Sequence, residues 1–388
     1  MEIKFFNTLG RSKQTFAPIG DVVTIYCCGP TVYHFAHIGN FRSYLFEDVL
    51  VRFLRFVGFP VKHVMNITDV GHLVSDSDEG EDKMIIAARK ENKDVFEIAE
   101  FYTKVFFDDS KKLNIRKPDV VCKATDHILD MITLIKKLEA KGLTYISGGN
   151  VYYDTSKFKD YNKLRGNSSL EKVARVEFDS NKRNPEDFVL WFTKSKYENH
   201  ILLWDSPWGR GYPGWHIECS AMAMRHLGET IDIHCGGCDH IPIHHTNEIA
   251  QSEGATGKQF ARFWLHNEFV LFNNDKMSKS KGSIVTVSDL ENEGFDALDY
   301  RYLTLTAHYR TQLNFTFDAL SSARSARKAL ILGLAKFVAE HKVDLDQLPK
   351  ITGNDLVNPL ADDLNTPQTL ANIWLLLESL NRENLSKI

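Results

Sequence analysis

The segment Val22-Val23-Thr24-Ile25-Tyr26-Cys27 decides the fold, because a helix and a second strand are expected to follow it. The segment is short, apolar and rich in β-branched residues, which is typical of a buried strand in a parallel sheet. After a turn at Gly29-Pro30, apolar residues recur at helical spacing from about Phe41 to Phe56, and Gly58 ends that helix. Val61-Lys62-His63-Val64-Met65 is the next strand. This order predicts a βαβ unit and therefore an α/β fold with a parallel sheet.

The remaining residues divide into segments of different character. The acidic residues 75–82 are expected to form a solvated loop. A long helical stretch is expected to follow it, from about Lys83 to Lys112. Residues 119–200 combine one helix with short strand-like pieces, so they are interpreted as an insertion between two halves of an α/β domain. From about Thr316 the chain is expected to be purely helical. The expected segments are 1–118 and 201–265 for the two halves, 119–200 for the inserted subdomain, 266–315 for a linker and 316–388 for a helical bundle.

Composition excludes several classes of protein. The 388 residues are 43% hydrophobic and carry a net charge of −4, so the chain is no general nucleic-acid binder, and any RNA contact requires basic residues gathered on one surface. No run approaches about 18 apolar residues, and the start shows no signal-peptide pattern, so a cytoplasmic protein without a membrane span is expected. Six cysteines in a chain of this length indicate reduced thiols, some of them metal ligands, rather than a disulfide scaffold.

Two motifs are suited to handling phosphate. His37-Ile38-Gly39-Asn40 stands just before the first helix of the βαβ unit, where an α/β sheet offers a helix N-terminus to an anion. A purely structural role for His37 is the alternative. Lys276-Met277-Ser278-Lys279-Ser280 predicts a cationic loop that can neutralise charge on a transferring phosphate, with an ordinary basic surface loop as the alternative.

A candidate metal site is dispersed over three segments. His244 and Glu248 are four residues apart, which places them on one face of a helix. Cys219 and Cys28, the residue that closes the first strand, would complete a set of four ligands suited to zinc. Cys235-Gly236-Gly237-Cys238 is a competing CxxC pair, for which a redox or second-metal role stands against two free cysteines in a tight turn.

The two phosphate motifs resemble the paired signatures of class I aminoacyl-tRNA synthetases, although Asn40 stands where that class usually has histidine. Three further segments resemble cysteinyl-tRNA synthetases specifically: residues 28–33 (CGPTVY), 215–220 (WHIECS) and 244–248 (HHTNE). The resemblance runs from about Phe5 to Pro367. Family members usually continue into an anticodon-reading domain, whereas this sequence stops within the helical part.

The resemblance implies a Rossmann-type catalytic domain that activates L-cysteine with ATP and transfers it to tRNA(Cys). It implies one Zn²⁺ per chain on Cys28, Cys219, His244 and Glu248, which selects the substrate thiol, and Mg²⁺ with ATP. His37, Asn40, Lys276 and Lys279 would be catalytic and, with Gly39 and Asp239, would bind ATP. The substrate-binding residues would be Gly29, Thr31, Thr68, Trp215 and His234. Asp69 would contact the substrate amine or cap the next segment. A monomer is expected.

Two other functions are compatible with the same motifs. One is a cysteine ligase that passes activated cysteine to an amino sugar, which would keep the zinc and phosphate motifs. The other is an RNA-binding protein without enzymatic activity, in which a closed zinc site is purely structural. Catalysis of cysteine-dependent pyrophosphate exchange would separate an enzyme from the second alternative, and the acceptor would separate it from the first.

Overall fold

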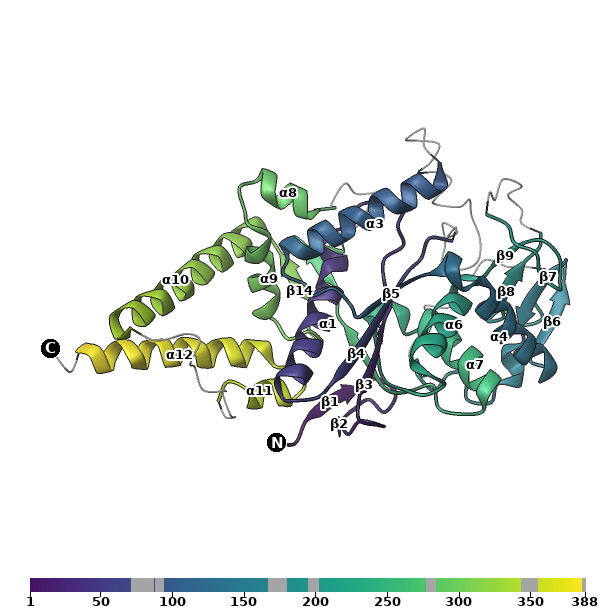
Figure 1. Cartoon of the computed structure of the whole chain (residues 1–388), viewed down its shortest axis with the longest axis horizontal. Coiled ribbons are helices and arrows are strands. Elements are labelled where there is room, and N and C mark those ends of the chain that lie inside the picture. The colour runs from purple at the N-terminus through teal and green to yellow at the C-terminus, as the bar shows by residue number, and fades with distance from the viewer. Residues whose placement is uncertain are drawn as a thin grey trace.

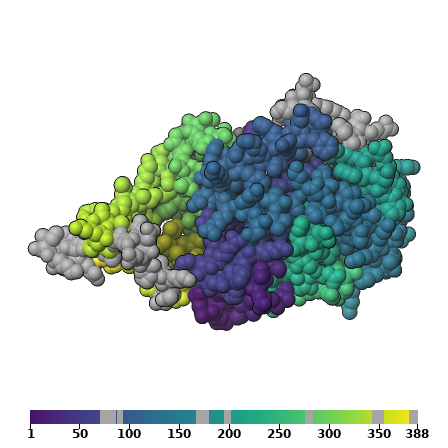
Figure 2. All heavy atoms as spheres, in the orientation of Figure 1, coloured from purple at the N-terminus to yellow at the C-terminus, as the bar shows by residue number. Residues whose placement is uncertain are grey.

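The computed structural model describes residues 1–70, 87, 94–166, 180–194, 202–276, 284–342 and 355–385. The molecule is elongated, with a parallel sheet in the middle of its length (Figure 1). Helices α10 (Phe317–His341) and α12 (Thr366–Leu385) lie at one end, and strands β6 to β9 lie at the other. The surface narrows toward α10, so the helical end is slimmer than the body (Figure 2). The acidic loop 75–82 lies outside the described residues.

The central sheet has five strands in the order β11-β10-β3-β4-β5, and every neighbouring pair is parallel. Strands β4 and β5 lie on one side of β3, and β10 and β11, which come later in the chain, lie on the other side. Ligands bind outside the carboxyl ends of such strands, at the point where the order reverses, which here lies between β3 and β10. The strands are β3 (Val23–Cys27), β4 (Val61–Ile67), β5 (Val120–Lys123), β10 (Ile231–Gly237) and β11 (Ala261–Asn267).

Alternate residues of β3 enter two different hydrophobic cores. Ile25 and Cys27 pack into the core that contains the apolar face of α1 (Ile38–Phe56). Tyr26 and Cys28 pack into the core on the opposite face, which α4, α6 and α7 cover (Figure 1). The two-residue period of a strand therefore places consecutive cysteines on opposite sides of the sheet. The bounds of these helices are Ile128–Ala140 for α4, Trp215–Leu227 for α6 and His244–Thr256 for α7.

The expected βαβ unit and α/β class are confirmed, although α1 begins at Ile38, three residues before the predicted Phe41. Helix α3 (Val95–Lys112) begins with Asp94, whose carboxylate accepts a hydrogen bond from the backbone N–H of Phe96. Of the helical stretch that was expected before it, residues 83–86 and 88–93 lie outside the described residues.

The insertion contains a separate antiparallel sheet of four strands in the order β6-β7-β8-β9. Its core includes Tyr145 and Tyr152, whose rings stack with centroids 5.4 Å apart. The boundary expected after residue 118 falls before β5, which pairs with β4, so the parallel sheet extends beyond it. The boundary expected after residue 200 likewise falls before β9, which pairs with β8, so the insertion's sheet extends beyond it. The five-segment division stays a proposal, with these shifts of two of its boundaries. The strands are β6 (Thr144–Ser147), β7 (Asn150–Tyr153), β8 (Phe188–Phe192) and β9 (Tyr212–Pro213).

The remaining elements surround the parallel sheet. A hairpin of β1 and β2 precedes it in the chain, and a three-stranded sheet of order β13-β12-β14 follows it. The strands are β1 (Lys4–Asn7), β2 (Ser12–Thr15), β12 (Val270–Phe272), β13 (Asp275–Lys276) and β14 (Leu313–Phe315). The helices are α8 (Val287–Asn292), α9 (Ala297–Leu305) and α11 (Asn358–Ala361). The short 3₁₀ helices are η1 (Ala124–His127), η2 (Thr155–Lys157) and η4 (Cys238–His240).

Asp363 joins the start of the chain to its helical part. Its side chain is fully buried, and Oδ1 accepts hydrogen bonds from the Phe6 backbone N–H at 2.8 Å and from the Tyr309 hydroxyl at 2.6 Å. The guanidinium of Arg310 donates to Oδ2 at 2.8 Å, and the Asp363 backbone N–H donates to the Lys4 carbonyl at 2.8 Å. A buried carboxylate with this many donors is held in one position, because each donor would be left unsatisfied without it.

Asp363→Ala should lower the free energy of unfolding by on the order of 3 kcal/mol, because Arg310 and Tyr309 lose a buried partner. The neighbouring Asp362 supplies a matched control, since its exposed carboxylate only pairs with Lys13 at the surface, at 2.7 Å. Asp362→Ala should change stability by less than about 1 kcal/mol. Chemical denaturation of the two variants measures the difference, and equal effects would contradict the role given to Asp363.

Candidate functional site

A pocket of ≈ 380 Å³ opens at the carboxyl ends of the central strands, where the strand order reverses. Its walls come from residues 28–37, which follow β3, from the ends of β4, β10 and β11, from the starts of α1, α6 and α7, and from α3. One end of the pocket is bordered by thiol and imidazole groups, and another part is bordered by the N-terminus of α1. The lining residues that the sequence had singled out are Cys28, Gly29, Thr31, His37, Gly39, Asn40, Thr68, Trp215, Cys219, Asp239 and His244.

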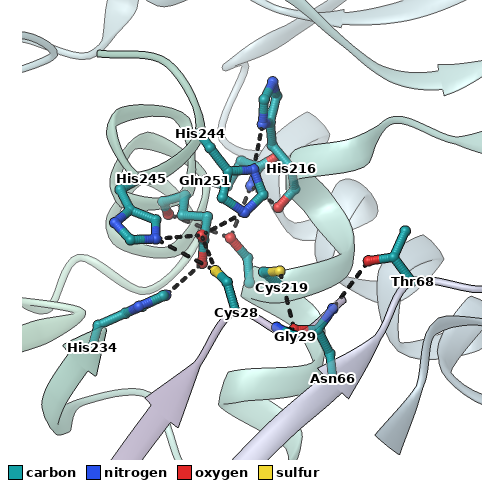
Figure 3. Close-up of polar contacts among 12 residues, drawn as sticks. Cys28, Gly29, Asn66, Thr68, His216, Cys219, His234, His244, His245 and Gln251 are labelled. Carbon is teal, nitrogen blue, oxygen red and sulfur yellow. Dashed lines mark hydrogen bonds and ion pairs between the residues drawn. The ribbon is translucent and has the colours of Figure 1, made fainter. Parts of the chain in front are cut away.

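Four potential metal ligands converge at the first end. Cys28 follows β3, Cys219 lies in the second turn of α6, and His244 and Glu248 lie one turn apart at the start of α7. One ligand atom from each of these four residues lies within 4.8 Å of the other three, and all four side chains are buried (Figure 3). Two sulfurs, one imidazole nitrogen and one carboxylate oxygen are a donor set that suits zinc.

Glu248 is the centre of this cluster. The Nε2 atom of His244 lies 3.0 Å from Oε1 of Glu248, and Nε2 of His234 lies 2.9 Å from Oε2. The Cys28 sulfur lies 3.9 Å from Oε1. The Nδ1 atoms of His216 and His244 are 2.9 Å apart, so His216 occupies the second ring nitrogen of a candidate ligand and fixes its orientation, as partners of metal-bound histidines commonly do (Figure 3).

A second set of four donors overlaps the first. Cys28 and Glu248 also lie within 4.8 Å of His234 and His245. The two histidines are fully buried and do not line the pocket, whereas Cys219 and His244 do. An ion held by the first set would therefore face a molecule in the pocket, while an ion held by the second set would be enclosed by protein. The first set is the better candidate for a site that handles a ligand.

The charges in the cluster suit the capture of a cation. Burial alone would raise the pKa of Glu248, but the imidazoles of His234 and His244 outweigh it and lower this pKa to about 2. A hydrogen bond from Cys28 lowers the pKa of the Cys219 thiol to about 6. Although burial opposes it, the charges of Glu248 and Cys219 raise the pKa of His244 to about 10. Near neutral pH the cluster thus carries two negative groups, and metal binding must displace the proton of His244.

The turn after β3 is held against the end of β4. A Cβ atom on Gly29 would lie 1.6 Å from the carbonyl oxygen of Asn66, so only glycine fits there. The Gly29 backbone N–H donates to Asn66 Oδ1 at 2.8 Å, and the Asn66 amide donates to the Thr68 hydroxyl at 3.0 Å (Figure 3). Thr31 and Thr68 form a backbone bridge beside this turn. These contacts bring two hydroxyl residues to the pocket wall next to Cys28.

The start of α1 forms the part of the pocket that suits an anion. The backbone N–H of His37 donates to Oδ1 of Asn40 at 3.1 Å, so the amide oxygen of Asn40 caps the helix and its NH₂ group is the part available as a donor. Gly39 lies between these residues on the pocket wall. A helix N-terminus with nearby donors favours phosphate or carboxylate groups.

The loop with the two lysines is described only at its edges. The backbone of Lys276 ends β13, and residues 277–283, which include Lys279, lie outside the described residues. Where the described chain resumes, the carbonyl of Val285 accepts a hydrogen bond from the N–H of Ile38 at 2.9 Å, and Thr286 bridges to His37. The chain after the loop is therefore fastened to the N-terminus of α1.

Trp215 and Asp239 both belong to the pocket wall. The indole ring of Trp215, the first residue of α6, stacks on His244 with ring centroids 4.2 Å apart. Asp239 lies in η4 directly after β10, at the carboxyl end of the sheet.

His234 and Asp69 lie away from the pocket lining. His234 is fully buried, contacts Glu248 and stacks on Trp264. Asp69 accepts hydrogen bonds from the N–H of Thr125 at 2.9 Å and from its hydroxyl at 2.7 Å, and this makes it a cap for the segment after β5. It does not line the pocket.

The two cysteines of the CxxC segment are not joined by a disulfide, and their surroundings differ. Cys235 is buried in β10 beside Cys27, whereas the thiol of Cys238 donates to Glu268 at 3.6 Å. Within the described parts of the chain, neither of them belongs to a cluster of potential metal ligands. This supports two free cysteines rather than a metal knuckle.

The sequence reasoning missed His216 and Asn66 as parts of the site. Neither lies at an informative spacing from a ligand, and both contribute through contacts that cross from one element to another. The available signal was the density of histidines around the ligand helix, which are His216, His234, His240, His244, His245 and His266.

Known proteins match this chain along most of its length. A family model described as the catalytic domain of class I (C) tRNA synthetases matches residues 15–325. A cysteine--tRNA ligase from Treponema denticola is 54% identical over 403 aligned residues, which cover 97% of this chain and 82% of that protein. A cysteine--tRNA ligase from Borreliella burgdorferi is 46% identical and covers 100% of this chain and 84% of its own length.

Solved structures share the fold at low sequence identity. Methionyl-tRNA synthetase from Mycobacterium tuberculosis, in complex with methionyl-adenylate, superposes with a TM-score of 0.68 at 16% identity and covers 94% of this chain and 83% of that one. A putative arginyl-tRNA synthetase from Campylobacter jejuni gives 0.59 at 14% identity, with 94% and 86% covered. At these identities the match supports the fold alone.

Cys219→Ser should lower the zinc content by about one ion per chain, because a hydroxyl replaces one of two thiolate donors. Cys238→Ser, the same change at a free cysteine outside the four-donor cluster, should leave the content unchanged. Metal analysis of the purified proteins after gel filtration gives both values. An unchanged zinc content in Cys219→Ser would remove Cys219 from the ligand set.

Proposed function

The chain belongs to the cysteine--tRNA ligases of the class I tRNA synthetase family, and from that premise we propose that it joins L-cysteine to ATP and then to tRNA(Cys). The single observation that carries the proposal is one pocket with two chemically different parts. Soft donors border one part, at Cys28, Cys219 and His244, and a helix N-terminus borders the other, at His37 and Asn40. A thiol-bearing amino acid and a nucleotide phosphate would thus meet in the same pocket.

The thiol end would select the amino acid. Cysteine and serine differ by one atom, and pockets built on shape or hydrogen bonds separate such pairs only modestly. Zinc held by Cys28, Cys219, His244 and Glu248 would supply a soft Lewis acid that prefers a thiolate to a hydroxyl. Trp215 would form an apolar wall beside the substrate, and Gly29, Thr31 and Thr68 would border it on the side of β3 and β4.

The phosphate end would bind ATP. The N–H groups at the start of α1, the NH₂ group of Asn40 and the side chain of His37 would donate to phosphate oxygens, and Gly39 would allow them to approach the backbone closely. Asp239 would accept hydrogen bonds from the ribose, and Mg²⁺ would accompany the nucleotide. The roles given to Lys276 and Lys279 rest on the resemblance of their motif to the class I signature.

The reaction would proceed in two steps, of which the first requires no general base. The substrate carboxylate attacks the α-phosphate of ATP, an oxygen–phosphorus bond forms, the bond between the α- and β-phosphates breaks, and pyrophosphate leaves. The terminal ribose hydroxyl of tRNA then attacks the carbonyl carbon of the adenylate, an ester bond forms, AMP leaves, and the hydroxyl proton passes to a phosphate oxygen of the leaving AMP. The protein contributes positioning and charge stabilisation, because the carboxylate is already a nucleophile.

The proposal also covers the molecule that accepts the activated cysteine and the compartment in which the protein acts. The matched relatives bear the name cysteine--tRNA ligase, which favours tRNA over an amino sugar as the acceptor. Among the described residues, no helix combines the length and the apolar character that crossing a bilayer requires. We further propose a monomer that acts in the cytoplasm.

Cysteine should support ATP–pyrophosphate exchange, and serine should do so at a rate lower by on the order of 10⁴-fold, because selection here depends on a soft metal rather than on shape. Cys219→Ser should lose cysteine-dependent exchange together with its zinc, while Cys238→Ser keeps both. Equal exchange with serine, or full exchange by zinc-free Cys219→Ser, would count against the proposal. Charging of tRNA(Cys) compared with an amino-sugar acceptor identifies the second substrate.

Asn40→Asp keeps the oxygen that caps His37, removes the NH₂ group and adds a negative charge beside the proposed phosphate site. Cysteine-dependent exchange should fall by at least about 10²-fold, because one donor to a developing charge is lost and a carboxylate repels the phosphates. The matched control is Asn365→Asp, since Oδ1 of Asn365 accepts from the N–H of Gln368 near the start of α12, outside the pocket. Both variants should keep the thermal stability of the parent. Unimpaired exchange by Asn40→Asp would exclude Asn40 from phosphate binding.

A further inference from the structure

A second cluster of potential metal ligands lies on the opposite face of β3 from the pocket. It consists of Cys27, Glu47 and His63, with one ligand atom from each residue within 4.8 Å of the others. All three are buried, with exposed fractions of 0%, 1% and 5%. None of them lines the pocket or takes part in the proposed reaction.

The fold brings these three side chains together from three elements. Cys27 ends β3 and lies in the core on the α1 side of the sheet. His63 is the register partner of Ile25, another residue of that core, so it faces the same side from β4. Glu47 comes from the buried face of α1, which covers this side.

The polar atoms of the cluster are not satisfied by the protein. Among the described residues, the Glu47 carboxylate has no polar neighbour within hydrogen-bond distance apart from the Cys27 thiol of the same cluster, and Nε2 of His63 has no hydrogen-bond partner. Buried polar atoms nearly always have partners, because an unpaired one costs about 1–3 kcal/mol and a buried unpaired charge costs more. Three unsatisfied atoms in one cluster therefore indicate that something outside the polypeptide completes it.

We propose that Cys27, Glu47 and His63 bind a second divalent cation of the zinc class, which joins α1 to the central sheet. Thiolate, imidazole and carboxylate are its preferred donors. Binding releases one proton from the Cys27 thiol and one from the Glu47 carboxyl, and the two resulting negative charges balance those of the ion. An electroneutral centre of this kind suits an apolar core, where a net charge would be costly.

A small cavity lies beside the cluster. It has a volume of ≈ 10 Å³ and is bordered by Glu47 and His63 but not by Cys27, and the basic side chains of Arg55, Arg116 and Lys117 also border it, so it suits a water molecule rather than the ion itself. Within the described residues the cluster offers three protein ligands, and a tetrahedral zinc ion would take a water molecule in its fourth position.

The ion would support the pocket without touching its contents. The elements that it joins are the three that carry Cys28 after β3, His37–Asn40 at the start of α1 and Asn66–Thr68 at the end of β4. Its role would be stability and positioning. The inference does not depend on the proposed function, because it uses no residue of the pocket.

Metal analysis of four forms of the full chain tests the proposal. The parent should hold about two zinc ions, Cys219→Ser about one, Glu47→Leu about one, and the double variant close to none. Glu47→Leu replaces an unsatisfied acid with an apolar group of similar size, so it should fold and retain exchange activity within about threefold of the parent. Glu47→Gln is the alternative if leucine does not fit.

A measurement without any change at Glu47 supplies the second test. Zinc added to metal-free Cys219→Ser should raise its melting temperature by at least about 5 °C, because the ion binds only the folded state. One ion in the parent and none in Cys219→Ser would overturn the proposal and leave a buried water in the cavity as the explanation. Two ions without cysteine-dependent exchange would instead uphold it and contradict the proposed function.

Discussion

The site depends on one buried negative charge, the carboxylate of Glu248. A carboxyl group enclosed by protein would normally take up a proton, because the low-polarity interior disfavours its ionised form. Here His244 and His234 contact one oxygen each, at 3.0 and 2.9 Å, and keep the group ionised. The charge of Glu248 also raises the pKa of His244, and it therefore affects how the group of Cys28, Cys219, His244 and Glu248 binds a cation.

The sheet supplies the frame for that charge. Reversal of the strand order between β3 and β10 opens a crevice, and the elements on either side contribute different chemistry to it. The α6 and α7 helices bring soft donors, and α1 brings backbone N–H groups. Amino-acid selection and phosphate binding can therefore share a pocket of ≈ 380 Å³ while their determinants lie on separate helices.

The sequence predicted the frame better than the interior of the site. Apolar periodicity found β3, α1 and β4, because a strand or helix buries a regular set of its own residues. Cys219 and His244 came together only through family resemblance, since dispersed ligands leave no spacing to read. The position of His234 beside Glu248 and the pairing of Asp69 with Thr125 depend on contacts between elements, which local patterns do not encode. The boundary after residue 118 missed β5 because a strand of four residues gives a weak signal.

The tie made by Asp363 bears on the order in which the molecule assembles. The N–H of Phe6 and the carboxylate that accepts it are 357 residues apart in the chain. During synthesis the first strand leaves the ribosome long before its partner exists, so this contact is made late and closes a loop that spans nearly the whole molecule. Contacts at such separation slow folding, and the β1–β2 hairpin must meanwhile be held by local pairing and by its contacts with β11. The N-terminal hairpin therefore reaches its final contacts only after residue 363 has left the ribosome.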